Sequence, residues 1–407
     1  TPFPSPPAAP VSLLQDPRFS RLAGWLVDAG ERTQGVGELL EGFSERLLQQ
    51  GVPVTRTTTH IQSLHSERTG TGRVWRRDRP FEEQHFGFSA MLDDRYARSP
   101  IRKVHDTRGW LSLWPQRDGG DFNIVPDLKA EGVEHYLIGP LFFSDGSIQA
   151  ASFATDRPEG FPPEDQALLQ SLMPLFSRML ELKTLRLTLG EILRIYVGRE
   201  PGARILSGQV RRGDVTALSA AMLVVDLRGF TQLSNQLADV PLVELLNRYF
   251  DCFVPPVAEN GGEVLKFIGD AVLAIFPQPG GEAPQREPRL AALAAAEEGL
   301  LRLDRLNAER PDEKPLKAGV ALHLGRVAFG NVGSVERQDF TVIGRDVNLA
   351  SRLSQLNART DEALLISAAF ARGLDRPLRP LGPFRLKGFD EKQRVFALED
   401  LAPRAAD

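Results

Sequence analysis

Hydrophobic positions in the first part of the chain change from a helical to a strand-like pattern. Between residues 12 and 50 they recur every three or four positions, as in Leu22, Trp25 and Leu26, and this period predicts two amphipathic helices. Runs rich in β-branched and aromatic residues follow: PVTRTTTHIQS, GRVWRRD, EHYLIGPLFF and SIQAASFATD. Such runs, separated by turns like SDGS, predict antiparallel strands. Residues 20–165 are therefore expected to form an α+β domain with an antiparallel sheet.

The segment before this domain has a different composition. It begins with TPFPSPPAAP, in which proline is frequent and large apolar residues are rare. A segment of this kind cannot bury enough apolar surface to offset its ordering entropy. Residues 1–19 are expected to be a disordered or short N-terminal segment.

A long helix with a regular apolar seam is predicted after the first domain. The seam residues fall at alternating steps of four and three: Leu168, Leu172, Leu175, Met179, Leu182, Leu189, Leu193 and Tyr196. This spacing is typical of a coiled coil, although Pro174 and Arg186 interrupt it. We expect a dimer seam within a linker helix and connector, residues 166–216. The alternative is a helix packed on its own domain.

Strands and helices alternate in the rest of the chain, from residue 217 to residue 400. The pattern gives the strand SAAMLVVDL, helical stretches, the hairpin EVLKFIGDAVLAIF, a helix from Arg289 to Leu306, and the strands KAGVALHLG and RVAFGNVG. Strand, helix, strand, strand, helix, strand is the ferredoxin-like split βαβ order. The C-terminal domain is therefore expected to be ferredoxin-like and α+β.

Composition limits the classes of function. A chain of 407 residues with 42% hydrophobic content is long enough for two or three cores. The formal net charge of -4 gives no strong field that would favour nucleic acid as a partner. The single cysteine, Cys252, excludes an internal disulfide and suits a reducing cytoplasm. No run reaches the ~20 apolar residues that span a bilayer, so we expect a cytoplasmic protein with no transmembrane segment.

Two aspartates are predicted at the ends of neighbouring strands. Asp226 ends an apolar run and precedes the turn RGFT, and Asp270 lies in the turn of the predicted hairpin. Alone, each is more typical of a turn or a helix cap. Together they are suited to hold two magnesium ions, which bridge nucleotide phosphates and activate an attacking hydroxyl. The turn after Asp226 offers backbone donors to phosphate oxygens, and Phe230 and Thr231 are its candidate substrate contacts.

Asn348 and Arg352 form a second candidate pair, in DFTVIGRDVNLASRL. Their spacing of four places an amide and a guanidinium on one face of a helix. Such a pair can bind a nucleotide. The alternative is an ordinary solvated helix face.

Five segments in order resemble the catalytic domain of class III nucleotidyl cyclases: DLRGFT, LKFIGDAVLAIF, GRVAFGNVGS, FTVIGRDVNLASRL and FRLKGF. The resemblance covers nearly all of residues 217–399 and is more specific than any single short motif. It implies that the 3′-hydroxyl of a nucleoside triphosphate attacks its α-phosphate and displaces pyrophosphate. Two Mg²⁺ or Mn²⁺ ions per site are implied as cofactors.

The resemblance also implies a role for each candidate residue. Asp226 and Asp270 correspond to the metal-binding aspartates, with the carbonyl of Leu227 as a further ligand. Asn348 corresponds to the residue that orients the ribose. Arg352 corresponds to the arginine that stabilises the pentacoordinate phosphorus.

Four further positions correspond to substrate-binding residues of the family. Lys387 matches a lysine that contacts the terminal phosphates, and Lys317 stands where many members have an arginine, a departure that keeps the charge but loses the bidentate fork. Lys266 and Thr341 correspond to the purine-selecting pair. Lysine is suited to donate to adenine N1, and a threonine hydroxyl is suited to accept from the exocyclic amine. The pair implies an adenylate cyclase of the class IIIb type with ATP as substrate; a guanylate cyclase is the alternative.

In this family each active site is shared between two catalytic domains. One domain gives the metal aspartates, and the other gives the purine-selecting, ribose-orienting and transition-state residues. This chain contains both sets, so a homodimer with two composite sites is implied. A non-catalytic nucleotide-binding signalling module is the competing hypothesis, which the complete set of residues disfavours.

The first domain resembles a GAF-type sensory domain in its order of helices and strands. No sharp motif supports this resemblance. The aromatic residues and histidines of the domain are typical of a packed core. A pocket for an unidentified small-molecule ligand is the functional alternative, and the domain is expected to regulate the catalytic one.

Overall fold

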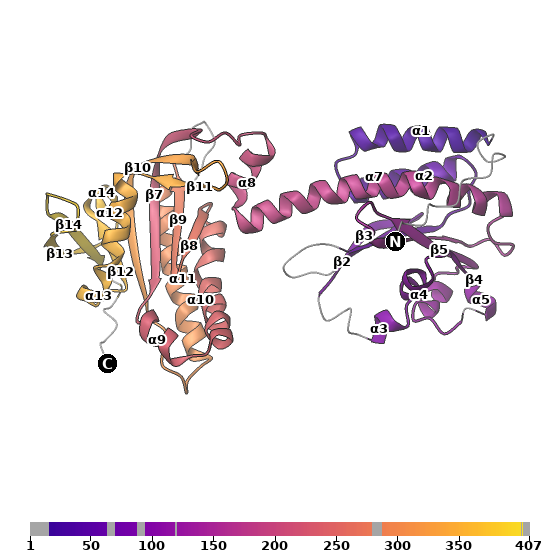
Figure 1. Ribbon diagram of the computed structural model, residues 1–407. Helices are drawn as coiled ribbons and strands as arrows, with labels where there is room; N and C mark the ends of the chain where they lie inside the picture. The colour runs from indigo at the N-terminus through magenta and orange to yellow at the C-terminus, as the bar shows by residue number, and fades with distance from the viewer. Residues whose placement is uncertain are drawn as a thin grey trace. The chain divides into compact units, whose positions relative to one another are not determined.

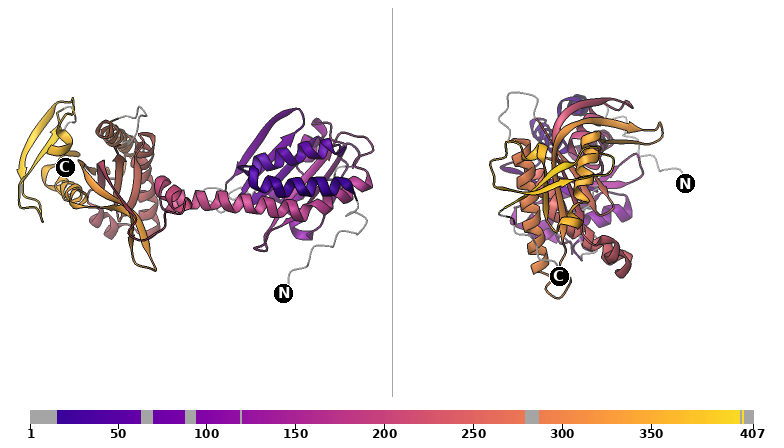
Figure 2. Two further views of the ribbon diagram at one scale, coloured as in Figure 1. Left: turned by 90° about the horizontal axis from the view of Figure 1, so that it is seen from above. Right: turned by 90° about the vertical axis from the view of Figure 1, so that its left-hand side faces the viewer.

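The computed structural model describes residues 16–62, 70–87, 94–118, 120–278, 287–399 and 401. The chain divides into two compact units, Thr1–Ile192 and Leu193–Asp407. Figures 1 and 2 show the elements of both units. Within the described ranges, no helix combines the length and the apolar composition that crossing a membrane requires.

The first unit contains a six-stranded antiparallel sheet in the order β3-β2-β1-β6-β5-β4. Its strands are β1 (Arg56–Gln62), β2 (Gly70–Arg76), β3 (Arg79–Phe86), β4 (Leu111–Leu113), β5 (His135–Phe142) and β6 (Ile148–Thr155). Its helices are α1 (Pro17–Arg32), α2 (Val36–Gln49), α3 (Asp94–Ala97), α4 (Pro100–Thr107), α5 (Pro115–Asp118), α6 (Val125–Ala130) and α7 (Pro163–Tyr196), whose last turn belongs to the second unit. The α+β prediction with an antiparallel sheet is confirmed, and the GAF resemblance stays a prediction.

Helices cover both faces of this sheet. Helices α1, α2 and α7 lie along one face, where Phe43 stacks on Phe176, and α4 and α6 lie along the other (Figure 1). Strands β5 and β6 are consequently buried along almost their whole length, as expected for strands covered on both faces. Helix α1 begins at Pro17 because Asp16 caps it, accepting the N–H of Arg18 at 2.8 Å.

The predicted seam along α7 is wrong for its first half. Leu168 and Leu172 are fully buried in the core of the first unit, and Leu175 and Met179 pack against that core. These side chains are therefore not available to a second chain, and here the alternative of a helix packed on its own domain is correct. From Leu182, which is 54% exposed, the seam faces solvent. The difference arises because heptad spacing also suits a helix that lies on a sheet.

The second unit is built on an eight-stranded sheet. Its strands are β7 (Val215–Leu227), β8 (Glu263–Ile268), β9 (Ala271–Pro277), β10 (Ala318–Gly333), β11 (Gln338–Ile343), β12 (Leu364–Ser367), β13 (Leu378–Phe384) and β14 (Gln393–Leu398). Its helices are α8 (Arg199–Leu206), α9 (Phe230–Gln236), α10 (Asp239–Glu259), α11 (Pro288–Ala308), α12 (Arg345–Ser354), α13 (Asn357–Thr360) and α14 (Ala368–Ala371). The strand order is β13-β14-β12-β10-β7-β9-β8, with β11 paired to β10.

The central strands follow the predicted β-α-β-β-α-β order, with β10-β7-β9-β8 side by side. Helices α10 and α11 cover one face, and α12 covers the opposite face beside β11. One expectation is corrected: the two strands predicted on either side of residue 325 are a single strand, β10. Gly325 and Arg326 do not break the strand, because both pair with the long strand β7 opposite Ala220 and Ser219.

Candidate active site

The structure brings Asp226 and Asp270 together. Asp226 lies at the end of β7, and Asp270 follows Gly269 in the turn between β8 and β9, where Gly269 adopts a positive φ of 63°. Strands β7 and β9 pair directly, with Val225 opposite Val272. The N–H of Leu227 donates to Oδ2 of Asp270 at 3.1 Å. Both carboxylates therefore meet at the same end of two adjacent strands.

The two carboxylates make this position electrostatically unfavourable without a cation. Burial, and then the charge of Asp270, raises the pKa of Asp226 to about 6. Burial, and then the charges of Asp226 and Asp270, raise the pKa of Tyr249 well above its ordinary value. A divalent cation relieves this repulsion, and carboxylate and carbonyl oxygens are the ligands that Mg²⁺ and Mn²⁺ prefer. The donor set thus fits the expected metal ions.

Within the part of the chain that the structure describes, Asp226 and Asp270 are the acidic side chains that we assign to this position. Among the described residues, no group of three or more histidine, cysteine, aspartate or glutamate side chains is placed to hold a metal ion. The remaining ligands of a metal bound here would be backbone carbonyls, water and substrate phosphates. Mg²⁺ sites that work on nucleotides commonly have this composition.

Gly319 and Tyr249 border the two aspartates and were missed by the sequence analysis. Gly319 pairs with Asp226 across β10 and β7, and a Cβ atom at 319 would come within 2.7 Å of Oδ1 of Asp226. The hydroxyl of Tyr249 is buried and has no hydrogen-bond partner among the described residues. For Gly319, the sequence signal is a glycine directly opposite a functional residue in a strand pair. For Tyr249 there is no sequence signal, because it is a lone tyrosine in an amphipathic helix.

The turn after Asp226 is tight. Gly229 adopts a positive φ of 74° and precedes α9 without a side-chain cap. Arg228 donates its backbone N–H to the carbonyl of Lys317 at 2.8 Å, which fixes the turn against the start of β10. Phe230 packs against the core and Thr231 is exposed. Their contacts with substrate stay a prediction.

Lys266 and Thr341 lie on β8 and β11, two strands that touch in the second unit. Nζ of Lys266 lies 3.3 Å from Oδ2 of Asp339, a residue that the sequence analysis did not single out. The hydroxyl of Thr341 is buried and has no partner among the described residues. A buried hydroxyl without a partner is costly, and a ligand that hydrogen-bonds to it removes the cost.

Asn348 and Arg352 lie on α12, which packs against the sheet beside β11. Asn348 is exposed, and Nη1 of Arg352 donates to Oε1 of Gln355 at 2.9 Å. Among the described residues of this one chain, no hydrogen bond or ion pair joins either residue to Asp226 or Asp270. The sharing of the site between two chains stays a prediction.

The two candidate phosphate-binding lysines lie on different segments. Lys317 directly precedes β10, beside the turn that follows Asp226. Lys387 is exposed on the connection between β13 and β14. Their contacts with phosphate stay a prediction.

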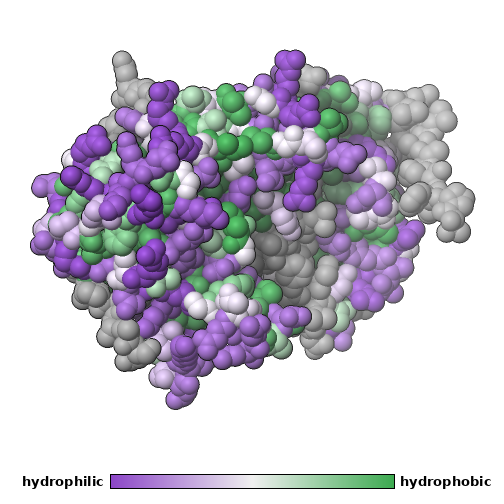
Figure 3. Space-filling view, turned by 60° about the vertical axis from the view of Figure 1, so that its left-hand side comes forward, coloured by the Kyte–Doolittle hydropathy of each residue, from purple (hydrophilic) through white to green (hydrophobic). Residues whose placement is uncertain are grey.

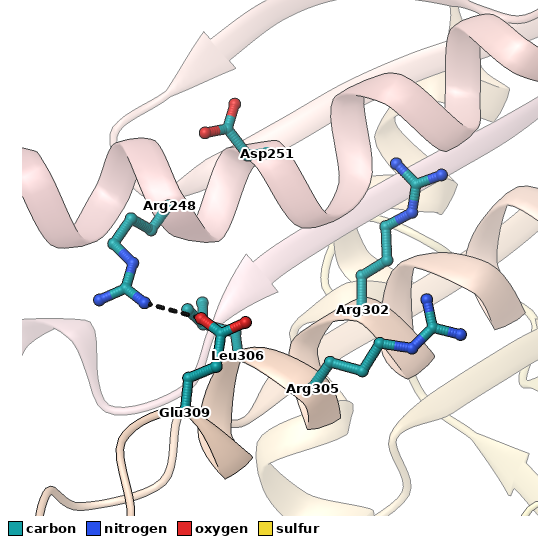
Figure 4. Close-up of a pocket in the computed structure, with 6 residues that line it drawn as sticks. All are labelled: Arg248, Asp251, Arg302, Arg305, Leu306 and Glu309. Carbon is teal, nitrogen blue, oxygen red and sulfur yellow. Dashed lines mark hydrogen bonds and ion pairs between the residues drawn. The ribbon is translucent and has the colours of Figure 1, made fainter.

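A groove between α10 and α11 contains none of the predicted site residues (Figure 4). Its basic side chains already have carboxylate partners: Arg248 pairs with Glu309 at 3.1 Å, and Arg302 with Glu259 at 2.9 Å. We do not assign a site there.

Part of the second unit is similar to known proteins. Residues 216–399 match the family model described as the adenylate and guanylate cyclase catalytic domain. The uncharacterized protein Rv1320c of Mycobacterium tuberculosis is 36% identical over 198 residues, which cover 49% of this chain and 33% of the relative. The adenylate cyclase of Anabaena cylindrica is 30% identical over 198 residues, covering 46% of this chain and 38% of the relative. The matches thus span about a third of the length of these curated relatives.

Solved structures of similar proteins are also found. The adenylyl cyclase CyaB from P. aeruginosa is 28% identical with a TM-score of 0.41, and the match covers 46% of this chain and 96% of that one. The guanylyl cyclase Cya2 is 27% identical with a TM-score of 0.39, and the match covers 47% of this chain and 99% of that one.

Proposed function

We propose that this chain, whose residues 216–399 match the model of the adenylate and guanylate cyclase catalytic domain, converts ATP into 3′,5′-cyclic AMP and pyrophosphate. The observation that carries the proposal is the meeting of Asp226 and Asp270 at the ends of β7 and β9, with the pKa of Asp226 raised to about 6. Two carboxylates forced together in this way are suited to bind cations, and cyclisation of a nucleotide needs cations at the phosphates.

The proposed roles divide between metal binding and positioning. Asp226, Asp270 and the carbonyl of Leu227 would hold two Mg²⁺ or Mn²⁺ ions, which when bound lower the pKa of the ribose hydroxyl and neutralise phosphate charge. Asn348 orients the ribose, and Arg352 stabilises the charge that develops on the phosphorus oxygens. These two residues should affect turnover more than binding.

The triphosphate contacts complete the proposed site. Lys317 and Lys387 neutralise the phosphates that leave as pyrophosphate. Backbone N–H groups of the turn, with Phe230 and Thr231, border the same end of β7. These groups hold the leaving group in line with the attacking oxygen.

The choice of ATP over GTP rests on Lys266 and Thr341. A Lys266→Glu/Thr341→Cys double variant is expected to lower kcat/KM for ATP at least about tenfold and to raise the GTP to ATP ratio, because it removes two hydrogen bonds that adenine makes. Initial rates with each nucleotide measure the ratio. Lys129→Glu, a charge reversal at an exposed lysine of the first unit, is the matched control. An unchanged ratio in the double variant would contradict the assignment.

We propose that two chains assemble to complete two sites. Among the described residues of one chain, no hydrogen bond or ion pair joins Arg352 to Asp270. Large apolar side chains beside the purine-selecting lysine are exposed: Phe267 by 51% and Ile268 by 58%. Charged and polar side chains cover most of the face drawn in Figure 3, with hydrophobic ones in small groups between them. Exposed apolar residues next to a half-formed site are suited to burial against a second copy of the chain.

Regulation is proposed to pass through α7. Its second half exposes Leu182, Leu185 and Leu189, which are free to contact a second copy of the helix. Inserting one residue near Leu185 turns the following helix by about 100° and is expected to change activity strongly, whereas a seven-residue insertion restores the phase and should be much milder.

Cyclic AMP formation is the readout for both insertions, at matched dimer occupancy measured by light scattering. Equal activities of the two insertion variants would mean that helix phase does not carry the signal. The first unit would then act as a tether or as a dimerisation aid.

The first unit offers one place for the expected small-molecule ligand. A cavity of about 280 Å³ lies between β1, β2, β3 and α7, and Thr71, Arg73, His85 and Thr184 contribute to its lining. The hydroxyl of Thr184 is buried without a hydrogen-bond partner among the described residues. We propose that a small polar ligand binds here, which a metabolite panel tests by the rise in melting temperature of the wild type and of a Thr184→Val variant. An equal rise in both would exclude this cavity.

Cellular location is inferred from the cysteine content. Cys252 is buried, and burial raises the pKa of its thiol to about 11, so it is suited to packing and not to redox chemistry. A chain of 407 residues with one unpaired cysteine fits a reducing compartment. We propose a cytoplasmic location on this basis, which fractionation of the native host tests.

A further inference from the structure

Asp346, in the first turn of α12, is bound to the strand beneath the helix. Its Oδ2 accepts the backbone N–H of Arg326 in β10 at 2.7 Å. This hydrogen bond has an ionised acceptor, which makes it stronger than a neutral one. It is a tertiary bond, because the two residues lie on different elements and are 20 positions apart. The start of α12 is therefore fixed to β10 at one defined point.

Gly325 provides the space that this bond needs. A Cβ atom at 325 would come within 2.5 Å of Cβ of Asp346 and would overlap its carboxyl group. The backbone of Gly325 does not require glycine, since its φ is not in the left-handed region. The absence of a side chain at 325 is thus explained by the approach of Asp346. Gly325 and Asp346 therefore act together: the first leaves the space that the second occupies.

His323 lies beside the same carboxylate, inside the core. The ring is 3% exposed, its Nδ1 lies 2.7 Å from Oγ of Ser367, and its Nε2 lies 3.5 Å from Oδ1 of Asp346. Burial lowers the pKa of His323, so the ring is neutral at neutral pH. If Ser367 donates its hydroxyl proton to Nδ1, the ring proton is on Nε2 and faces Asp346. Both oxygens of Asp346 then face groups of β10.

The rest of α12 is held to the sheet by apolar contacts. Leu349, Ala350 and Leu353 are buried against the sheet, and apolar contacts of this kind are non-directional. The residue before the helix, Gly344, gives no side-chain cap. The Asp346 bond is directional, because a hydrogen bond weakens steeply away from its preferred angle. It therefore adds a defined direction to the way the buried face of α12 orients the helix.

We propose that Asp346, held by the N–H of Arg326, with His323 beside it and with space given by Gly325, is a positioning residue that sets the direction in which Asn348 and Arg352 project from α12. The inference rests on the proposed cyclase function of these two residues. Asp346 does not touch the nucleotide in this role. It acts through the helix, and displacements near 1 Å at a catalytic group cost ~100-fold in rate.

Two substitutions at Asp346 separate this role from a general effect on the fold. Asp346→Ala is expected to lower kcat about 10- to 100-fold while KM for ATP stays within about twofold, because Lys266 and Thr341 lie on other strands. Asp346→Asn retains an oxygen that accepts the N–H of Arg326, so it should recover to within about threefold of the wild type. Asp239→Ala, in the exposed first turn of α10, is the matched control and should be silent.

Gly325→Ala is an independent variant. It keeps the carboxyl group of Asp346 but displaces this side chain from β10. It should resemble Asp346→Ala, with a lowered kcat and a nearly unchanged KM. Mixing chains locates the defect: Asp346→Ala should regain activity when paired with Asp270→Ala and not when paired with Arg352→Ala. A variant whose whole catalytic domain is misfolded would restore no activity in either mixture.

The outcomes are distinguishable from failure of the proposed function. A wild type that cyclises neither ATP nor GTP overturns the proposed function itself. An active wild type with a fully active Asp346→Ala variant overturns the positioning role alone. Equal losses in Asp346→Asn and Asp346→Ala, or a rise in KM that accounts for the whole loss, also overturn it.

Discussion

Replacing Asp226 or Asp270 by alanine is expected to lower turnover at least about a thousand-fold, because bound metal ions contribute several kcal/mol to stabilising the transition state and each ~1.4 kcal/mol is a factor of ten. Both side chains lie at strand ends in the second unit, where few core contacts depend on them. The dimer should survive in both variants. Cyclic nucleotide formation and light scattering on the same samples measure the two properties.

The stability of the Asp226 variant is a control, because the direction in which it should change is known. The pKa of Asp226 in the fold, about 6, lies above its ordinary value of 3.8, so the fold disfavours the ionised carboxylate at neutral pH. Asp226→Asn should therefore not lower the melting temperature of the metal-free protein. Stability from this group is present at acidic pH and is lost as the pH rises through about 6. A fully active Asp226→Ala enzyme would contradict the metal assignment, whatever its stability.

Mixing inactive Asp270→Ala chains with inactive Arg352→Ala chains is expected to restore activity. Each mixed dimer contains one site with both substitutions and one site with neither. Random pairing makes half of the dimers mixed, and each of these has one intact site of two, so about a quarter of the wild-type rate is expected. Arg352→Ala alone should lose about a hundred-fold or more, because the guanidinium is needed most in the transition state.

The mixing experiment requires proof that mixed dimers form. Two affinity tags of different kinds, one on each variant, allow the mixed dimers to be purified before assay. Mixed dimers without activity would mean that each site belongs to one chain.

Most of the longer strands and helices of both units followed from hydrophobic spacing, because a period of two and a period of 3.6 are distinct over long runs. Strand β3 and the short elements β4 and α3 to α6 of the first unit were not predicted. The boundary predicted inside β10 was wrong, because glycine followed by arginine resembles a turn. Only the register with β7 shows that the strand continues through Gly325. The length of a strand depends on its partner, which a local pattern does not contain.

The candidate residues were predicted as a set of motifs, and the structure adds what holds them. Asp226 and Asp270 were expected at neighbouring strand ends, and they lie there. Asp339 beside Lys266, and Asp346 against Gly325, were not expected. Each of these contacts joins elements distant in sequence, and a single aspartate at a strand or helix end has no spacing that would reveal its partner. The apolar spacing along α7 correctly predicted a helix, but it did not predict which surface buries the apolar face. A sheet and a second helix bury the same stripe of side chains.

Identification of the product formed from ATP and from GTP tests the central claim most directly. Purified protein is incubated with Mn²⁺ and each nucleotide in turn, the products are identified by mass spectrometry against cyclic AMP and cyclic GMP standards, and the Asp270→Ala protein gives the background. The account predicts cyclic AMP from ATP, with kcat/KM at least about tenfold above that for GTP. No cyclic product above the Asp270→Ala background, or a preference for GTP, would contradict it.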